Sequence, residues 1–321
     1  MKSLISKNFS ATLLIAFITI FGCQKKSDPP VNSDPDTYST LSDFYNANGV
    51  KSEFFTLNAT TGGSFVSAKG TKITIKPNSF VDNQYNTISG TVKIEFKDIY
   101  SKSDMLMSNM PTMMEGGFPL KSAGEFYISA SYDNVPINIA NGKPILIQQP
   151  VQPGATLDTA MKPFVFAKVG WVQPPKDTVS IVPVSDSINY LANTYVFSFS
   201  NFLYANGQGT WANSDNPTFF AKYPQATLNI ITDFPLNDYI NDLYLVFKGI
   251  NTAVHVYDNG TGFQYSHAPA GLPCTIVIVG VKGKKLYASF TDITISNNQT
   301  VHIPISEIST DDFKKKLKAL D

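Results

Sequence analysis

The chain has 321 residues, of which 43% are hydrophobic, and its 25 basic residues balance 25 acidic residues to give a formal net charge of zero. All of the basic residues are lysine, so the guanidinium group that grips phosphate or carboxylate through two hydrogen bonds is missing. A balanced charge also provides no basic surface for nucleic acid. We therefore expect no nucleic-acid partner.

Residues 1–22 are predicted to be a signal peptide. Lys2 and Lys7 precede an apolar run from Ala11 to Phe21, and the small residue Gly22 follows. This order is typical of a secretory signal, and the run is shorter than the ~20 residues of a permanent membrane-spanning helix.

The residues IFGC at positions 20–23 resemble the lipobox of bacterial lipoproteins, in which the cysteine is acylated and becomes the mature N-terminus. The resemblance implies that Cys23 is the lipidation site, that the membrane is a partner through this lipid anchor, and that the protein resides in the cell envelope. Gln24 permits placement in the outer membrane, on its periplasmic face or at the cell surface.

Residues 23–50 are predicted to be a tether. This segment is polar, contains three prolines and shows no sustained periodicity. A short helix within it, at residues 38–47, would place Leu41, Phe44 and Tyr45 on one face.

The fold class is predicted to be all-β, with two β-sandwich domains and one C-terminal amphipathic helix. Apolar and polar residues alternate with a period of two around Ile73 and Ile75 and again in residues 91–98, which is typical of strands with one solvated face. The first sandwich is assigned to residues 51–153, and residues 154–177, which contain QPP, are assigned to a linker.

Residues 178–321 are predicted to form the second sandwich. The uninterrupted apolar run TIVIVGV at 275–281 indicates a central strand covered on both faces, with Cys274 buried and inert beside it. Residues 258–262 read as the turn of a hairpin. At the C-terminus, Ser309 or Thr310 can cap a helix whose Phe313, Leu317 and Leu320 share a face.

Residues 60–96 resemble the opening of ZU5-type β domains. The matching positions are a glycine pair, a strand end, a Pro-x-Ser-Phe segment and a later glycine, namely Gly62, Gly63, Ile75, Pro77, Ser79, Phe80 and Gly90. In such a domain Pro77 would end a strand, and Phe80 would fold beneath it into the core. With the lipobox, the pattern resembles Bacteroidetes-type lipoproteins.

Some ZU5-containing proteins cleave themselves at a His-Phe-Ser sequence. The nearest counterpart here is Asn201-Phe202-Leu203, which has neither the nucleophile nor the base of that reaction. The self-cleavage activity is therefore not carried over to this chain.

The sequence contains none of the common nucleophile-elbow, P-loop, dinucleotide-binding or zinc-protease motifs. We expect a protein without catalysis, cofactor or metal. A zinc site would need His255, His267, His302 and Cys274 to converge, and their spacing does not support it. Catalysis stays an alternative only if His255, His267 and a carboxylate converge in one pocket.

Carboxylates are the other residues that could form a catalytic or metal site. Glu125 and Asp133 bracket a predicted strand, which gives no reason to pair them as catalytic acids. Asp233, Asp238 and Asp242 could hold calcium, but they lack the EF-hand spacing, so a solvated loop is expected there.

One polar segment around a tryptophan is the speculative ligand-binding site. Trp211, Asn213 and Asp215 combine a flat aromatic ring with amide and carboxylate groups, which suits stacking on a sugar and bonding to its hydroxyls. The structural alternative is that Trp211 fills the junction between the domains.

The sequence thus predicts a lipid-anchored envelope protein that acts as a binding or scaffold module. A glycan-binding accessory lipoprotein is the first alternative, and a fimbrial or adhesin subunit is the second. The partner would be a glycan or another envelope protein.

Overall fold

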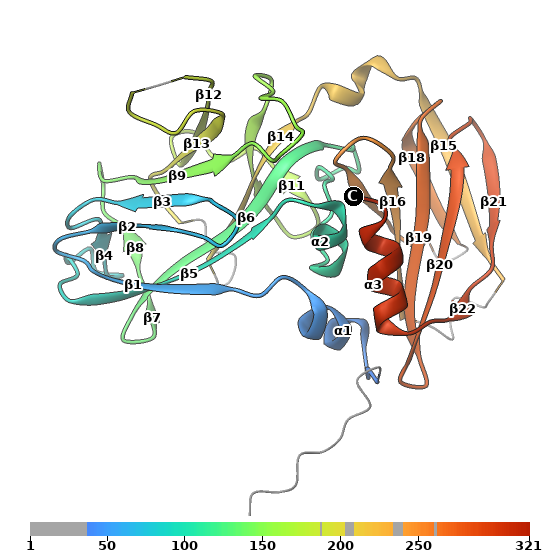
Figure 1. Cartoon of the computed structure of the whole chain (residues 1–321), viewed down its shortest axis with the longest axis horizontal. Helices are drawn as coiled ribbons and strands as arrows, with labels where there is room; N and C mark the ends of the chain where they lie inside the picture. Colours follow the sequence, from blue (N-terminus) through green and yellow to red (C-terminus); the bar gives the residue numbers. More distant parts are fainter. Residues whose placement is uncertain (1–36, 187, 203–208, 234–239, 260–261) are drawn as a thin grey trace, which may run out of the picture. The chain divides into compact units, whose positions relative to one another are not determined.

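Antiparallel strands make up most of the computed structural model, which describes residues 37–186, 188–202, 209–233, 240–259 and 262–321 (Figure 1). Residues Asp36–Asp321 belong to one compact unit. Its strands form two sandwiches, so the all-β class with a C-terminal helix is confirmed.

The first sandwich consists of two large sheets. Sheet 1 has the order β1 (Glu53–Asn58), β5 (Thr91–Ile99), β6 (Lys121–Tyr132), β14 (Thr210–Asn216), β10 (Lys162–Phe166) and β11 (Trp171–Val172), with β7 (Val135–Pro136) beside β6. Sheet 2 has the order β12 (Val179–Val184), β13 (Thr194–Phe199), β9 (Ile145–Pro150), β3 (Lys72–Ile75) and β2 (Gly63–Val66). The short strands β4 (Phe80–Val81) and β8 (Asn138–Ile139) pair separately.

The core of this sandwich is aromatic and β-branched. The ring of Phe126 from sheet 1 meets those of Phe197 and Phe199 from sheet 2, with centroids 4.9 and 5.7 Å apart. Phe80 is fully buried in the same core, and β3 ends at Ile75, two residues before Pro77. The roles expected for Pro77 and Phe80 are therefore confirmed.

The second sandwich pairs a three-stranded sheet with a five-stranded one. Sheet 3 has the order β18 (Phe263–Pro269), β15 (Gln225–Thr232) and β21 (Gln299–Ile303), with β15 and β21 parallel. Sheet 4 has the order β17 (Ala253–Val256), β16 (Ile240–Phe247), β19 (Pro273–Lys282), β20 (Lys285–Thr294) and β22 (Ser306–Glu307). The 3-10 helix η1 (Phe219–Lys222) precedes β15.

β19 is covered on both faces, as the unbroken apolar run predicted. It lies between β16 and β20, and all residues from Cys274 to Val281 are buried. Cys274 is fully buried, and this burial raises the pKa of its thiol to about 12. The expectation of a buried, inert cysteine is confirmed.

Three α-helices occur among the described residues: α1 (Leu41–Asn48), α2 (Lys102–Met107) and α3 (Thr310–Lys318). The N-caps follow the sequence, because Thr40 Oγ1 accepts from the Asp43 amide and Ser309 Oγ accepts from the Asp312 amide. α1 and α3 pack together on sheet 4, where the rings of Phe44 and Phe313 lie 5.6 Å apart. The amphipathic helix predicted from Phe313, Leu317 and Leu320 is confirmed.

Three sequence expectations are corrected. Residues 37–48 are not part of a free tether, because the face of α1 predicted from Leu41 and Phe44 is buried on sheet 4. The linker expected at 154–177 does not separate the sandwiches, because β12, β13 and β14 all pair within the first one. The turn expected at 258–262 is closed by an antiparallel bridge between Asp258 and Phe263, but it does not continue into a hairpin, since β17 joins sheet 4 and β18 joins sheet 3.

The physical reason for these corrections is shared. Alternation identifies a strand but not the sheet that it joins, and a proline pair interrupts pairing without ending a domain. No helix in the described part of the chain is long and apolar enough to cross a membrane. The predicted signal peptide, Cys23 and residues 24–36 of the predicted tether lie outside the described residues.

Candidate functional site

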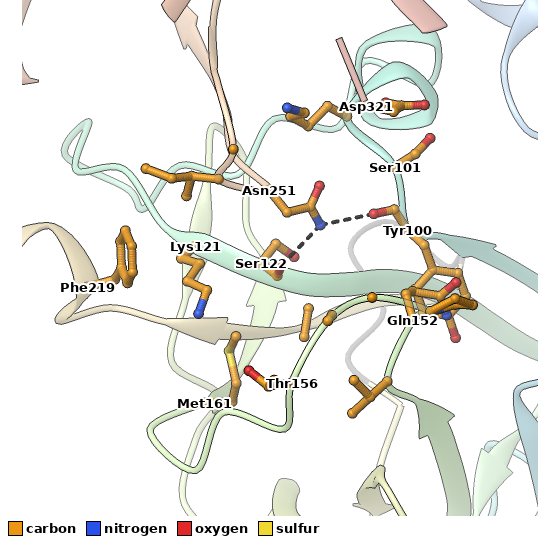
Figure 2. Close-up of a pocket in the computed structure, with 18 of the residues that line it drawn as sticks. Tyr100, Ser101, Lys121, Ser122, Gln152, Thr156, Met161, Phe219, Asn251 and Asp321 are labelled. Carbon is orange, nitrogen blue, oxygen red and sulfur yellow. Dashed lines mark hydrogen bonds between the residues drawn. The ribbon is translucent and has the colours of Figure 1, made fainter. Parts of the chain in front are cut away.

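A pocket of about 660 Å³ lies at the junction of the two sandwiches (Figure 2). The first sandwich contributes the turn after β5, the start of β6 and the connection after β9. The second half contributes η1, the loop after β16 and the C-terminal residue Asp321. The pocket is therefore assembled from segments that are far apart in the sequence.

One asparagine fastens the loop after β16 to the first sandwich. Asn251 Nδ2 donates to the carbonyl oxygens of Tyr100 (2.9 Å) and Ser122 (3.1 Å), the two bonds drawn in Figure 2. The Ser122 amide donates in return to the Asn251 carbonyl oxygen at 2.9 Å. These three bonds fix one wall of the pocket.

The two lysines in the pocket lining already have partners. Lys121 Nζ pairs with Asp158 Oδ2 at 2.9 Å, and Lys102 Nζ donates to the Phe247 carbonyl oxygen at 2.9 Å. Burial lowers the pKa of Lys102. Burial would raise the pKa of Asp158, but hydrogen bonds from Asn216 and Lys121 lower it below its ordinary value. The charge of Lys121 is thus balanced by Asp158, and the charge acting on Lys102 is that of Asp321, which also lines the pocket.

The remaining lining combines apolar and polar groups. Phe219 is half-buried, with Lys121 Nζ 5.0 Å from its ring centroid, and Met161, Gln152 and Thr156 also line the space. Neither histidine nor cysteine is found among the described residues of the lining. This lining offers an aromatic face and hydrogen-bonding groups, which suit binding of a small amphipathic molecule.

The speculative site at Trp211, Asn213 and Asp215 is corrected by the structure. All three lie on β14, a central strand, and Asn213 and Asp215 are fully buried, so they cannot bond a sugar at the surface. Trp211 is half-buried against Tyr127, with ring centroids 5.4 Å apart. The segment looked like a polar connection because its outward side chains are polar, although the rest of the protein covers them.

The sequence reasoning missed the partner of this strand, Glu125. Glu125 is also fully buried and lies directly opposite Asn213, within β6 rather than at a strand end. Asp215 follows two residues farther along β14, beyond a β-bulge between Ser214 and Asp215. None of the side-chain polar atoms of these three residues forms a well-aligned hydrogen bond within the described structure, although the Ser122 and Asn213 side chains lie close enough to Asp215 to act on its carboxylate.

Two buried acids side by side are electrostatically unfavourable. Burial, and then the negative charge of Asp215, raise the pKa of Glu125 well above its ordinary value. Burial raises the pKa of Asp215 to about 8, although the nearby Ser122 and Asn213 side chains offset part of the rise. A buried polar group without a partner costs about 1–3 kcal/mol, so the arrangement requires a physical explanation.

The histidines do not come together. His255 Nε2 lies 3.1 Å from Asp242 Oδ1, His267 stacks on Phe118 with centroids 4.0 Å apart, and His302 lies on β21. Within the described ranges, no three His, Cys, Asp or Glu side chains gather as metal ligands. A zinc site would need the three histidines and Cys274 to converge, and an enzyme would need His255, His267 and a carboxylate in one pocket; neither convergence is observed among the described residues.

The acidic run before β16 is also resolved differently. Asp242 lies within β16, where its carboxylate accepts from Tyr45 at 2.7 Å and faces His255, rather than in a solvated loop. Asp233 is exposed, and Asp238 lies outside the described residues. Asp242 therefore helps to hold α1 on sheet 4.

The pocket itself had no signal in the sequence. Asn251 and Ser122 are ordinary polar residues near turns, and only the packing of the two sandwiches brings them together. Comparisons with protein-family models, curated proteins and solved structures found no match to this chain. The ZU5 and lipoprotein resemblances therefore remain predictions from the residues that carry them.

Proposed function

We propose that this protein is a lipid-anchored binding protein of the cell envelope that acts without catalysis, and that its ligand is a neutral glycan fragment bound in the junction pocket. The observation that carries the proposal is the pocket of about 660 Å³ with the Phe219 ring in its wall. A volume of this size lies in the range of small-ligand sites.

The chemistry of the lining favours a neutral ligand. Lys121 is paired with Asp158, and Asp321 in the lining acts on Lys102, so the positive charges at the pocket have negative charges beside them. A sugar ring presents an apolar face to an aromatic side chain and hydroxyls to neighbouring polar groups. Phe219 and the side chains of Gln152 and Thr156 supply that combination.

The membrane part of the proposal depends on the residues before the described structure. The signal-like segment and Cys23 support lipid anchoring, and the outer membrane is the proposed location. The described chain begins beside α1, which is docked on sheet 4. An anchor at Cys23 would thus be joined to the second sandwich by the short segment before α1.

The test is a binding measurement on the full chain in a mild detergent. Neutral oligosaccharides and peptidoglycan fragments are titrated, and the thermal midpoint and the binding isotherm are recorded. A ligand at 100 times its Kd adds about 2.7 kcal/mol to the free energy of unfolding, which is readily observed. We expect Phe219→Ala to abolish binding and Phe54→Ala, an exposed phenylalanine on β1, to retain it.

Trp211 distinguishes a second location for the same ligand. It lies with Tyr127 on sheet 1, outside the set of residues that line the pocket. Loss of glycan binding in Trp211→Ala but not in Phe219→Ala would contradict the pocket proposal and favour that sheet. Absence of any glycan binding would contradict the glycan proposal and favour a protein partner.

A further inference from the structure

Six buried polar atoms without hydrogen-bond partners occur together on one face of sheet 1. They are the side-chain polar atoms of Glu125, Asn213 and Asp215, and in the described chain the other atom of this kind is Gln149 Nε2. Because buried polar groups in proteins are nearly always bonded, such a concentration indicates a missing partner.

The strand register places the three side chains close together. Glu125 and Asn213 are directly paired across β6 and β14, where side chains on one face lie about 5 Å apart at Cβ. Asp215 is two residues beyond Asn213 on the same strand, so it shares that face. The oxygens of two carboxylates and one amide therefore line a single region of the sheet.

The surroundings of Glu125 and Asn213 are closed and apolar, whereas Asp215 has Ser122 and the exposed Lys162 as its cross-strand neighbours. Ile99 on β5 pairs with Glu125, and Phe164 on β10 pairs with Asn213, so the polar pair has an apolar neighbour on each side. Both Ile99 and Phe164 are fully buried in a cluster with Met105 and Trp171. These apolar neighbours offer no hydrogen-bond donor to Glu125 or Asn213.

The charge of the cluster points to a divalent cation. When ionised, the two carboxylates carry two negative charges, and the lysine opposite Asp215, Lys162, is exposed at the surface rather than buried with them. A divalent cation would make the buried group neutral and would accept all the orphaned oxygens as ligands. A monovalent cation would leave one buried negative charge.

We propose that Glu125, Asn213 and Asp215 form a buried calcium site. The metal-binding atoms are all oxygens, the ligands that calcium and magnesium prefer, whereas zinc and copper are usually bound through nitrogen or sulfur. Two bidentate carboxylates and the Asn213 carbonyl oxygen supply up to five ligands, and Ser122, opposite Asp215, offers its hydroxyl oxygen. Magnesium keeps several waters, whereas calcium accepts an all-protein shell, so a closed site favours calcium.

This site would stiffen the junction between the sandwiches. Ser122 lies opposite Asp215, and its backbone groups are bonded on both sides to Asn251, which belongs to the loop after β16. A cation held beside Ser122 would therefore order the start of β6 and the loop that is fastened to it. The role is structural, and it is independent of which ligand occupies the pocket.

The first measurement is made on the full chain purified in detergent with calcium present. We expect mass spectrometry of the dialysed protein to find about one calcium per chain. We also expect EDTA to lower the thermal midpoint and added calcium to restore it, with a shift of about 5 °C at 100 times the Kd. Magnesium at the same concentration should restore much less.

Conservative variants then locate the ion. Glu125→Gln and Asp215→Asn keep the side-chain shape and remove one charge each, so we expect both to lose the bound calcium and the response to EDTA. Glu95→Gln is the matched control, because Glu95 lies on the adjacent strand β5 with partial exposure and bonds Ser52. It should keep the calcium and the shift.

Two outcomes would overturn the inference. A wild-type chain that holds no calcium and whose thermal midpoint ignores both EDTA and calcium would show that the two acids are instead neutral, protonated carboxyls. An equal response to magnesium and calcium would overturn the assignment to calcium. Both results come from the wild-type protein, so they do not depend on whether the variants fold.

Discussion

Replacing Phe44 with alanine tests whether α1 is an integral part of the second sandwich. Phe44 is fully buried, and its ring lies edge-on to Tyr38 and Phe313 with centroids 5.2 and 5.6 Å away. Burial of about 150–200 Å² of apolar surface at about 25 cal/mol per Å² contributes about 4 kcal/mol. We expect Phe44→Ala to lower the free energy of unfolding by about 3–5 kcal/mol.

The assay is urea denaturation of residues 36–321, which form one compact unit. Far-ultraviolet circular dichroism follows all the strands, whereas fluorescence follows the first sandwich, because Trp171 and Trp211 both lie on its strands β11 and β14. Coincident transitions would show that the two sandwiches unfold together. If the transitions are separate, we expect Phe44→Ala to destabilise the second sandwich, whose unfolding is seen by circular dichroism and not by fluorescence.

Phe54→Ala is the control for this measurement. Phe54 is 56% exposed on β1, so its truncation should cost less than about 1 kcal/mol. If Phe44→Ala proved no more destabilising than Phe54→Ala, α1 would not be docked in solution. The residues of α1 would then belong to the tether, as the sequence predicted.

Three further predictions concern the pocket wall, the α1 contact and the anchor. Asn251→Ala should lower the free energy of unfolding by about 1–3 kcal/mol in urea, because two buried carbonyl oxygens lose their donor, and an unchanged midpoint would contradict this. Burial would raise the pKa of Asp242, but hydrogen bonds from His255 and Tyr45 lower it below its ordinary value. The ionised carboxylate therefore stabilises the fold above a pH of about 4, and this stabilisation is lost on acidification. Asp242→Asn should reduce the fall of the thermal midpoint at acidic pH, and an unchanged fall would refute the prediction. Cys23→Ala should release the protein from membranes on fractionation, whereas a wild-type chain of unacylated mass would rule out the anchor.

Local signals in the sequence predicted many elements of this fold correctly. The Ser309 cap, the amphipathic face of α3 and the apolar run of β19 each depend on neighbours within a few residues. Such features are encoded by periodicity and capping chemistry alone. The all-β class followed from the same alternation.

Features that depend on distant pairing could not be predicted. The alternation around Trp211 is compatible with a polar surface strand, but β14 is central and its outward face is covered, so Asn213 and Asp215 are buried. Glu125 lies next to them only because of the pairing register between β6 and β14. Two strands so far apart in the sequence do not show which residues will face each other. Predicting the pocket would likewise require the packing of five or more segments that are far apart in the sequence.

The buried acids and the pocket wall are connected through Ser122, and this connection argues against regarding either as incidental. Apolar residues at positions 125, 213 and 215 would give a folded state of lower free energy, since well-packed apolar groups often replace buried charges without loss of stability. The chain instead keeps two acids and an amide beside the residue that Asn251 fastens across the junction. Sequences that depart from apolar packing at one place do so most often where function requires it. If calcium is absent and Glu125→Gln stabilises the protein, this reasoning fails and the junction is only a packing interface.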